Sequence, residues 1–585
     1  MKLVGPALPA VAHPSANASL KRAASSNEGL RLVARDETET FRSYGELYDR
    51  ARTVAAALME RGVQPGERVA LVLPTGWDFV EAFYGVQLAG AVPVPLYPPV
   101  RLGRMEEYAL ATGRMLQVSG ACIVLTDRRV RLLLGKAVEL ARPRLGCPTV
   151  SELFEGSNRA EREVSGDDLA LIQFSSGSTV DPKPVALTHA QLMAQTAALK
   201  ALLPQREGTH EKGVSWLPLY HDMGLIGCLL LASYWPGELV LIPPEAFLAR
   251  PALWLRALSR HRATISPAPN FAYGLCLKRI DDAELEGVDL SSWTYALNGA
   301  EPVSLSIAEK FAERFGRNGF RRDAMLPVYG LSEASLAVTF PPPREQLKVK
   351  QADEAVLAAK REVVAGERVF VSVGVPVPGF EVEVRDDEGQ LTGPARVGRV
   401  FARGPSVMRG YFGLSEATEK ALKDGWLDTG DLGFVDDGEL FLCGRAKDLV
   451  IIRGANHPPQ AFEECLDGLD GVRAGCAAAV GFIPKGEHEE ALLMLVETQD
   501  PVPANLGETI SSAVVARTGI RPHTVRLLEP GTLPRTSSGK LRRSEAARRF
   551  VAGELSAPGR VNALSVGAEV AKSAVAHVKR VLSKT

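Results

Sequence analysis

The chain has 585 residues, of which 46% are hydrophobic and 23% are charged. This is the composition of a globular protein, and the length is sufficient for several domains of about 100–200 residues each. The formal net charge of -1 excludes the strong overall field that attracts nucleic acid or an anionic membrane. Seven cysteines are scattered without a CxxC pair or a Cys/His metal spacing, which favours reduced thiols in a cytoplasmic protein. The sequence contains no apolar run of about twenty residues, so we expect no stable membrane insertion.

The N-terminal region alternates between predicted helices and strands. Ser43 with Glu46 three residues later forms a capping box, so a helix is predicted to begin there and to end near Gly62. The elements expected after it are a strand at 69–73, a helix at 77–88 and a strand at 91–96. This βαβ order predicts a parallel sheet covered by helices.

The segment from Ile172 to His189 reads IQFSSGSTVDPKPVALTH and concentrates small hydroxyl and glycine residues. A strand is predicted at 169–174, and a helix at 190–203 behind a second capping box. The cluster is therefore expected to connect a strand to a helix, where open α/β sheets bind ligands. A flexible linker is the alternative, but a linker is not normally bracketed by two such elements. No Walker loop, GxxxxGK[ST], is present, yet small residues followed by Lys183 suit a polyphosphate.

The last quarter of the chain has a different pattern. Residues 425–442 are rich in turns and read as a hairpin, and after them the elements become smaller. Strands are predicted at 475–480 and 492–496, a helix at 508–517, and a terminal helix at about 560–585. For the terminal helix, a docked helix is favoured over one that binds a membrane or a partner. We therefore predict an α/β protein with a large domain at 1–444 and a small mobile α+β domain at 445–585.

Six further motifs follow the hydroxyl-rich cluster in a fixed order. They are SWLPLYHDMGLIG (215–227), LNGAEPVS (297–304), VYGLSEASL (328–336), GWLDTGDLG (425–433), FLCGRAKDLVIIRGANHPPQAFE (441–463) and LPRTSSGKLRR (533–543). Together they resemble the adenylate-forming superfamily of acyl-CoA synthetases, peptide-synthetase adenylation domains and luciferases. The residues of the stretches YHDMGLIG, NGAEPV and RGANHPPQ most resemble those of the fatty acyl-AMP ligases. The resemblance extends over roughly residues 30–555.

The resemblance implies roles for individual residues of these motifs. The implied ATP-binding residues are Ser175, Ser176, Gly177, Ser178, Thr179, Lys183, Asn298, Gly299, Ala300, Glu301, Tyr329, Gly330, Leu331, Ser332, Asp431 and Arg445. Within this set the resemblance implies that the segment 175–183 is the phosphate loop, that 298–301 flanks the adenine and that Tyr329 stacks on it. It likewise implies that Asp431 accepts the ribose hydroxyls and that Arg445 contacts the ribose or a phosphate.

Further residues are implied to take part in the reaction or in domain motion. Glu333 matches the acid associated with magnesium, Lys540 the catalytic lysine and Lys447 the hinge of the small domain. His221 is expected on the substrate side of the site.

Each of these assignments has a simpler alternative. Asp431 lies in TGD and could form an ordinary Asx-turn. Lys540 could belong to a solvated basic run with neighbouring arginines, and His221 could be a core histidine.

The implied reaction is ATP-dependent formation of acyl-AMP from a fatty acid, with magnesium and release of pyrophosphate. A fatty carboxylate is already ionised at pH 7, so positioning and positive charge at the α-phosphate are required rather than a general base. Two departures from the family's pattern, Val180 and Pro184, stiffen the phosphate loop. A non-catalytic acyl or nucleotide binder and an acyl-CoA synthetase are the alternative functions.

The resemblance to the fatty acyl-AMP ligases also implies which molecule accepts the acyl group. Fatty acyl-AMP ligases pass the acyl group to the phosphopantetheine arm of an acyl carrier protein, which we expect on a separate chain. Their extra segment, thought to restrain the small domain, corresponds here to residues 341–368. A solvent-facing loop without a role is the alternative for this segment. The expected partners are thus a fatty acid and a carrier protein, and not nucleic acid.

Overall fold

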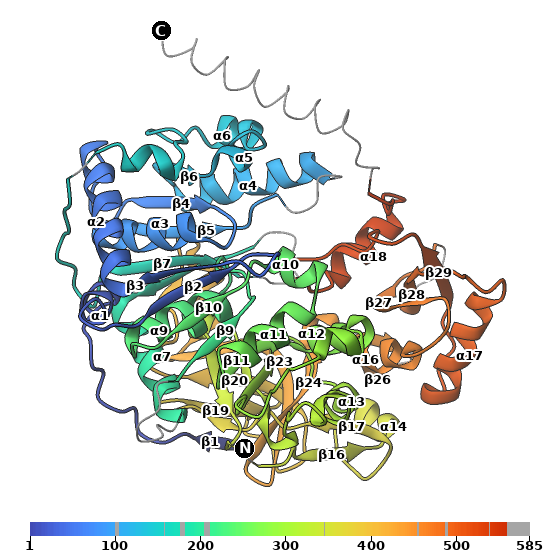
Figure 1. Ribbon diagram of the computed structural model, residues 1–585. Helices are drawn as coiled ribbons and strands as arrows, with labels where there is room; N and C mark the ends of the chain where they lie inside the picture. The colour runs from blue at the N-terminus through green and yellow to red at the C-terminus, as the bar shows by residue number, and fades with distance from the viewer. Residues whose placement is uncertain are drawn as a thin grey trace.

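The structure is a computed structural model that describes residues 1–99, 104–156, 158–175, 182–203, 211–343, 345–452, 455–485, 489–536 and 539–558. It is an α/β protein in which a large body built from several sheets is joined to a small α+β body near the C-terminus (Figure 1). Within the described residues, no helix combines the length and the apolar character that crossing a bilayer requires. The predicted terminal helix at 560–585 lies outside the described residues.

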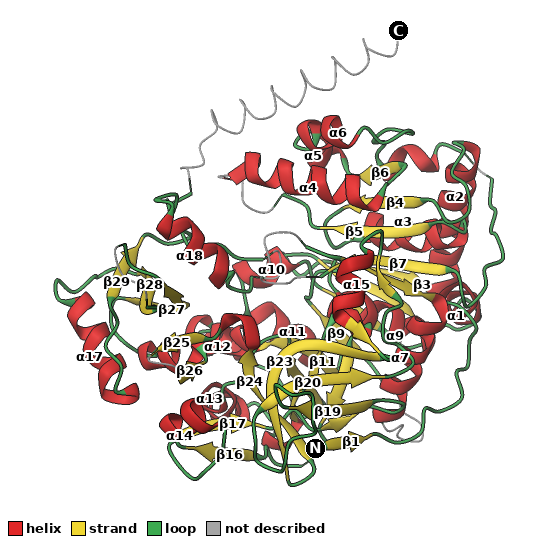
Figure 2. Cartoon of the chain, turned by 180° about the vertical axis from the view of Figure 1, so that it is seen from behind, coloured by secondary structure: helices red, strands yellow, loops and turns green. Residues whose placement is uncertain are grey.

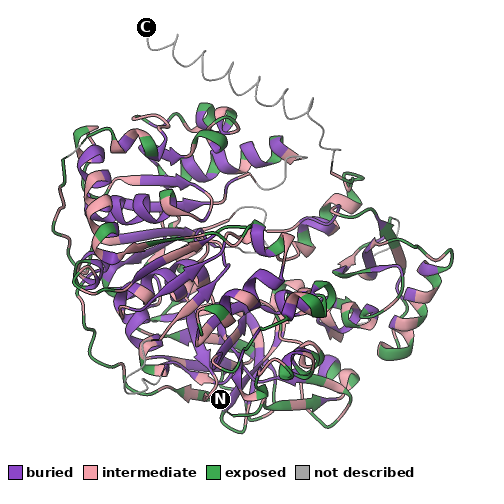
Figure 3. Ribbon diagram, viewed as in Figure 1, coloured by how far each residue is buried: buried purple, intermediate pink, exposed green. Residues whose placement is uncertain are grey.

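The largest sheet has seven strands and is parallel except at one edge. In spatial order its strands are β13 (Met325–Pro327), β12 (Tyr295–Gly299), β11 (Ile265–Pro269), β9 (Gly213–Ser215), β10 (Leu239–Leu241), β2 (Gly29–Val33) and β3 (Glu39–Ser43). Only β3 runs antiparallel to its neighbour. One face is covered by α11 (Ala252–Arg260), α12 (Asn270–Arg279) and α13 (Leu305–Gly316), which share a core rich in aromatic side chains. Purple buried residues fill these layers in Figure 3.

The N-terminal region contains the predicted βαβ unit. Strands β5 (Val92–Leu96), β4 (Arg68–Val72) and β6 (Ile123–Thr126) form a parallel sheet packed with α2 (Tyr44–Glu60), α3 (Trp77–Leu88) and α4 (Met105–Ser119). The predicted capping box begins α2, because Ser43 and Glu46 bond each other's backbone N–H groups. The predicted bounds of α3 are those observed.

The connection at residues 175–183 differs from the prediction. Strand β7 (Leu169–Phe174) is followed not directly by a helix but by β8 (Pro184–Thr188), which pairs antiparallel with β7. Helix α7 (His189–Leu202) then begins at the predicted Thr188 capping box. The sequence reasoning missed β8 because five buried residues are too few for a clear period. Proline is tolerated at the first position of a strand, which is where Pro184 lies.

The hairpin predicted at 425–442 belongs to an antiparallel sheet. This sheet contains β1 (Lys2–Val4), β19 (Glu381–Arg385), β20 (Gly398–Arg403), β22 (Leu422–Lys423), β23 (Trp426–Asp436) and β24 (Glu439–Arg445). Strands β23 and β24 form the hairpin and place Asp431 opposite Arg445. Figure 2 shows these strands in yellow beside the larger sheet.

The segment 341–368 is structured over most of its length. It contains β16 (Val349–Ala352) and α14 (Glu354–Lys360), and β16 pairs with β17 (Arg368–Val371). Ala352 and Leu357 pack against Phe434 and Phe441 of the β23–β24 hairpin. Helix α14 also packs against β26 (Ala455–His457), the second strand of a hairpin with β25 (Val450–Ile452). The segment therefore touches both the large body and the chain beyond residue 444.

The small body is a three-stranded sheet with helices on both faces. Strands β27 (Val472–Phe482) and β28 (Ala491–Thr498) are antiparallel, and β29 (Thr524–Leu528) runs parallel to β28. Alternate residues of these strands face α16 (Pro459–Glu463) and α17 (Leu506–Thr518) on one side and α18 (Arg543–Val551) on the other. The strands predicted at 475–480 and 492–496 and the helix predicted at 508–517 are present with longer bounds.

Candidate active site

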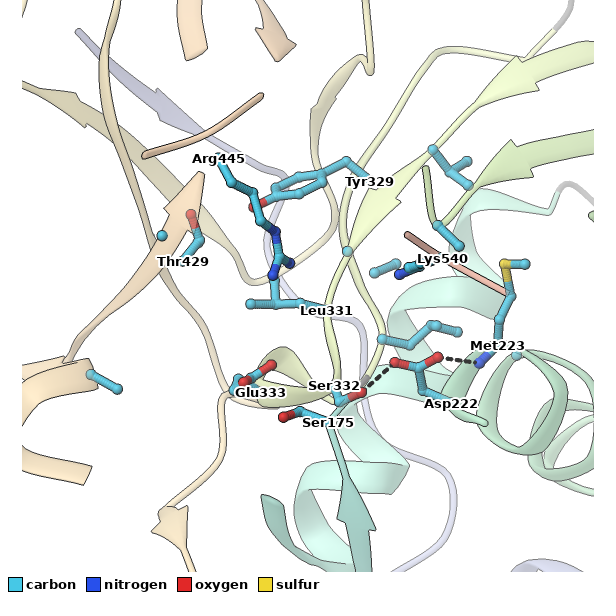
Figure 4. Close-up of a pocket in the computed structure, with 18 of the residues that line it drawn as sticks. Ser175, Asp222, Met223, Tyr329, Leu331, Ser332, Glu333, Thr429, Arg445 and Lys540 are labelled. Carbon is cyan, nitrogen blue, oxygen red and sulfur yellow. Dashed lines mark hydrogen bonds between the residues drawn. The ribbon is translucent and has the colours of Figure 1, made fainter. Parts of the chain in front are cut away.

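A cavity of about 530 Å³ lies where the loops of the large body meet a loop of the small body. Its polar lining includes Lys183, Glu333, Arg445, Lys447 and Lys540. Figure 4 shows Glu333, Arg445 and Lys540 reaching the same space from different segments of the chain. Residues that are more than 200 positions apart in the sequence thus meet at one site.

The rest of the lining is largely apolar. Much of it lies on or beside α7, β11, β12, β15 (Ala337–Phe340) and η3 (Leu225–Leu230), which has π-helical hydrogen bonding. The apolar residues include Leu199, Leu203, Met223, Gly227, Leu231, Ile265, Leu336 and Phe340. Gly227 keeps this wall open, since a Cβ atom there would lie 2.8 Å from Leu336 Cδ2.

Asp431 is held by two residues at the edge of the cavity. It is only 7% exposed, and Tyr329 donates its hydroxyl to Asp431 Oδ2 at 2.6 Å. Arg445 Nε lies 3.2 Å from Oδ1, and this carboxylate raises the pKa of the Arg445 guanidinium. Asp431 itself is not among the lining residues, but Thr429 and Gly430 of the same strand are. The carboxylate is thus part of a polar network rather than a simple turn.

Two hydrogen bonds join the two ends of the predicted phosphate loop, Ser175 and Lys183. Ser175 N–H donates to the Lys183 carbonyl at 2.8 Å, and Lys183 N–H donates to Ser175 Oγ at 3.4 Å. Both residues line the cavity. The predicted ligands Ser176, Gly177, Ser178 and Thr179, like Val180, lie outside the described residues.

Lys540 enters the cavity from the small body. Its loop is fixed by Lys540 N–H donating to Thr536 Oγ1 at 3.0 Å and by Thr536 N–H donating to the Lys540 carbonyl at 2.8 Å. Burial lowers the pKa of the Lys540 ammonium, and the nearby Asp222 carboxylate opposes that effect. Burial likewise lowers the pKa of Lys447, with Arg445 adding to the effect. Lys540 therefore lines the cavity, and its catalytic role stays a prediction.

The segment predicted to flank adenine contributes one lining residue, Ala300, whose φ is +68°. Such a backbone conformation is costly for alanine and is typical of functional loops. Asn298 is buried and donates to Asn270 Oδ1 at 3.4 Å, while Glu301 Oε1 accepts from the Phe271 N–H at 2.6 Å. Gly299 packs so closely on the Val328 backbone that a Cβ atom would lie 2.8 Å from its carbonyl oxygen. These three residues support the loop without lining the cavity.

The YGLSE motif supplies a continuous stretch of lining residues. Tyr329, Gly330, Leu331, Ser332 and Glu333 all face the cavity from β14 (Tyr329–Gly330) and the short helix η6 (Ser332–Ala334). This arrangement brings the residues expected for adenine and magnesium together.

His221 is not among the lining residues. Its backbone N–H donates to the Pro218 carbonyl at 3.2 Å, and its ring lies 5.0 Å from that of Tyr220. The adjacent Asp222 lines the cavity instead and is joined to Ser332 by a hydrogen bond, drawn as a dashed line in Figure 4. A substrate-side role for His221 stays a prediction.

The sequence analysis did not assign several polar lining residues, namely Asp222, Tyr411, Arg399, Lys420, Asp428 and Thr429. Asp222 Oδ1 also accepts from the Met223 N–H at 2.8 Å. Tyr411 donates its hydroxyl to Glu333 Oε1 at 2.9 Å. Asp222 could have been noticed beside His221 in a quoted motif, whereas the sequence around Tyr411 carried no such signal.

The arrangement at Glu333 fits the way in which Mg²⁺ is usually held near phosphates. Magnesium at such sites takes one or two carboxylates together with phosphate oxygens and water, rather than a cage of protein ligands. Glu333 provides one carboxylate near Lys183, and the described residues contain no cluster of three or more His, Cys, Asp or Glu side chains suited to a metal. Glu333 would therefore hold the metal jointly with a bound nucleotide.

Comparison with known proteins identifies the family. Residues 20–412 match the AMP-binding enzymes. The chain belongs to this family. A protein of Caulobacter vibrioides, named provisionally as an acyl-CoA synthetase, is 36% identical over 92% of this chain and 96% of its own length.

A medium-chain-fatty-acid–[acyl-carrier-protein] ligase of Moorena producens is 32% identical over 88% of this chain and 90% of its own. Among solved structures, one from a study of fatty acyl-adenylate ligases of E. coli and L. pneumophila has a TM-score of 0.87 at 32% identity. It covers 93% of this chain and 99% of that one. The resemblance to fatty acyl-AMP ligases and the predicted fold class are both confirmed.

Proposed function

We propose that this AMP-binding enzyme activates a fatty acid with ATP to form acyl-AMP and pyrophosphate, and then transfers the acyl group to the phosphopantetheine thiol of an acyl carrier protein. The observation that carries the proposal is the composition of the cavity. A wall of Leu199, Leu203 and Leu231 suits an alkyl chain, while Lys183, Arg445 and Lys540 suit an anionic nucleotide. Carboxylate and α-phosphate can meet where these two parts join.

The residues have distinct tasks in this reaction. Asp431 would accept the ribose hydroxyls, and Tyr329 would pack against the adenine. Lys540 would place its ammonium at the α-phosphate, where negative charge increases as the fatty carboxylate attacks. Magnesium bound at Glu333 would supply further positive charge on the phosphates. The buried setting strengthens each of these interactions because water screens them less.

The small body is proposed as a mobile domain at 445–585 that turns about Lys447. In the present arrangement Lys540 lines the cavity, which is the arrangement that adenylation requires. Transfer to a thiol would follow a change in the position of this loop. The predicted domain 1–444 with its insertion at 341–368 is part of the same proposal, as is a cytoplasmic location, where ATP and a carrier protein on a separate chain are accessible.

An acyl-CoA synthetase is the second candidate, favoured by the name of the Caulobacter relative. The contact between α14 and β26 favours the carrier protein instead, because it ties the insertion to the chain that must move. The test is mass spectrometry of the products from ATP, a series of fatty acids, CoA and a holo carrier protein. Acyl-AMP and acyl-carrier products support the proposal. Efficient formation of acyl-CoA would identify an acyl-CoA synthetase, and absence of pyrophosphate release would indicate a non-catalytic binder.

A further inference from the structure

Tyr411 lies on β21 (Gly410–Tyr411), a short strand that is fixed to the end of the predicted phosphate loop. Gly410 and Tyr411 pair with Ala186 and Val185 of β8. The Phe412 N–H donates to the Pro184 carbonyl at 2.7 Å. The strand therefore holds the chain immediately after Lys183.

The same segment is also fixed to the YGLSE loop. The Met408 N–H donates to the Glu333 carbonyl at 2.8 Å, and the Tyr411 hydroxyl donates to Glu333 Oε1 at 2.9 Å. Residues 408–412 thus connect Glu333 to the strand that follows Lys183. The two attachments come from parts of the chain that are otherwise distant in sequence.

The Tyr411 ring contacts the lysine of the phosphate loop. Lys183 Nζ lies 4.7 Å from the centroid of the ring, within the range of a cation–π interaction. Tyr411 is 8% exposed, and all three side chains line the cavity. One tyrosine therefore contacts both the carboxylate and the ammonium group that face the proposed polyphosphate.

These contacts leave the reactive groups able to bind a ligand. A ring face attracts the lysine without using its N–H donors, so the ammonium can still donate to phosphate oxygens. The phenol takes one lone pair of one Glu333 oxygen, so the carboxylate keeps acceptor positions for a cation. A fixed carboxylate and a fixed ammonium lose less freedom when a metal–polyphosphate complex binds.

We propose that Tyr411 is a positioning residue that holds Glu333 and Lys183 in the geometry needed for magnesium-bound polyphosphate. The inference rests on the proposed function, which places that complex at these two residues. The hydroxyl acts on the metal side through Glu333, and the ring acts on the phosphate side through Lys183. The two actions can be separated by substitution. Tyr411→Phe keeps the ring but removes the hydroxyl, whereas Tyr411→Leu removes both.

The first test compares Tyr411→Phe with the wild type in a magnesium titration. We expect the Mg²⁺ concentration for half-maximal pyrophosphate release to rise about tenfold or more, as for loss of one hydrogen bond to a charged group. The rate at saturating Mg²⁺ should change less than twofold. Tyr108→Phe is the matched control, because Tyr108 donates its buried hydroxyl to the Tyr97 carbonyl at 3.0 Å, a bond within the N-terminal layers. This control should leave the Mg²⁺ requirement unchanged.

A second test uses binding rather than turnover. Calorimetry of ATP at several Mg²⁺ concentrations should show a weaker Mg²⁺ dependence of affinity in Tyr411→Phe, and a further loss of affinity in Tyr411→Leu. In a Glu333→Gln background, Tyr411→Phe should add little, because the two residues act as a unit. Additive effects, or an unchanged Mg²⁺ requirement in an active Tyr411→Phe enzyme, would overturn the inference. If the wild type releases no pyrophosphate, the proposed function fails separately, while ATP calorimetry still tests Tyr411.

Discussion

Ser332 donates its hydroxyl to Asp222 Oδ2 at 2.5 Å, and this bond joins the YHDMG and YGLSE loops across the cavity. The carboxylate that receives it also acts electrostatically on the Lys540 ammonium, which arrives from the small body. Ser332 is adjacent to Glu333, the expected magnesium residue. The bond therefore holds Asp222, which lies near the proposed catalytic lysine, next to the loop that carries the proposed magnesium residue.

Replacement of Lys540 by alanine should reduce acyl-AMP formation at least about 100-fold. Loss of one charge aimed at the transition state in a buried site has effects of this size. Lys540→Arg should also be poor, since a planar guanidinium does not replace a compact ammonium. Pyrophosphate release is the measurement. Lys485→Ala is the control, because Lys485 is an exposed lysine of the same body. Near wild-type adenylation by Lys540→Ala would show that another group supplies the charge.

Asp431→Ala should weaken ATP binding at least tenfold. The carboxylate is expected to accept two ribose hydroxyls through charge-assisted bonds of about 1.5–3 kcal/mol each. Its loss also releases Tyr329 and leaves the Arg445 guanidinium without its partner. Calorimetry measures the affinity, with the exposed Asp387→Ala as a control that should bind ATP normally. An unchanged affinity in Asp431→Ala would reduce Asp431 to a structural role.

The sequence predicted those parts of the fold that depend on local pattern. Helices α2 and α3 were predictable because a capping box and a 3.6-residue period are local signals. Strand β8 was not, since its identity depends on pairing with β7 and β21. The site residues in quoted motifs could likewise be assigned by resemblance. Asp222 lies in such a motif, but its hydrogen bond to Ser332 could not be predicted, and neither could that of Tyr411 to Glu333. The two partners lie 110 and 78 positions away in the chain.

Gly227→Leu should shift the enzyme toward shorter fatty acids. A side chain at this position must displace Leu336, and both residues line the apolar part of the cavity. We expect the ratio of kcat/KM for long over short chains to fall about tenfold or more, since single methylene differences in apolar pockets reach 10–200-fold. Gly507→Leu in α17 is a control, because no atom lies within 4 Å of a Cβ there. An unchanged chain-length profile would place the alkyl chain elsewhere.

His189 should make the large body sensitive to mild acid. Burial lowers the pKa of His189 to about 4 from the usual 6.5, and its Nδ1 accepts from the Ala16 N–H at 3.3 Å. The unfolded chain therefore binds a proton that the folded chain excludes, and stability falls as pH drops from about 6.5 to about 4. The loss from this residue at pH 5 is about 2 kcal/mol.

Thermal unfolding at pH 7.5 and pH 5 measures this effect. His189→Gln retains an acceptor without a titrating ring, so its unfolding temperature should fall less between the two pH values than that of the wild type. An equal fall in both proteins would mean that other groups cause the acid sensitivity.

Weakening the contact between the insertion and the small body should increase acyl-CoA formation. Glu354 of α14 binds Arg368 at 2.7 Å and lies 3.9 Å from Nδ1 of His457 on β26. Removing the whole insertion would also expose Phe434 and Phe441, which it covers, so a point variant is the cleaner test. If the contact penalises the CoA-competent orientation by ~3 kcal/mol, under about one per cent of molecules adopt it. A carrier protein can offset that penalty through its own contacts with the small body, where CoA alone has few.

Glu354→Ala should thus raise acyl-CoA formation several-fold while acyl-AMP formation stays within twofold. Glu345→Ala is the control, because Glu345 lies in the same insertion but pairs with Lys348 at 3.5 Å. Equal acyl-CoA formation in the wild type and both variants would show that this contact does not select the acceptor.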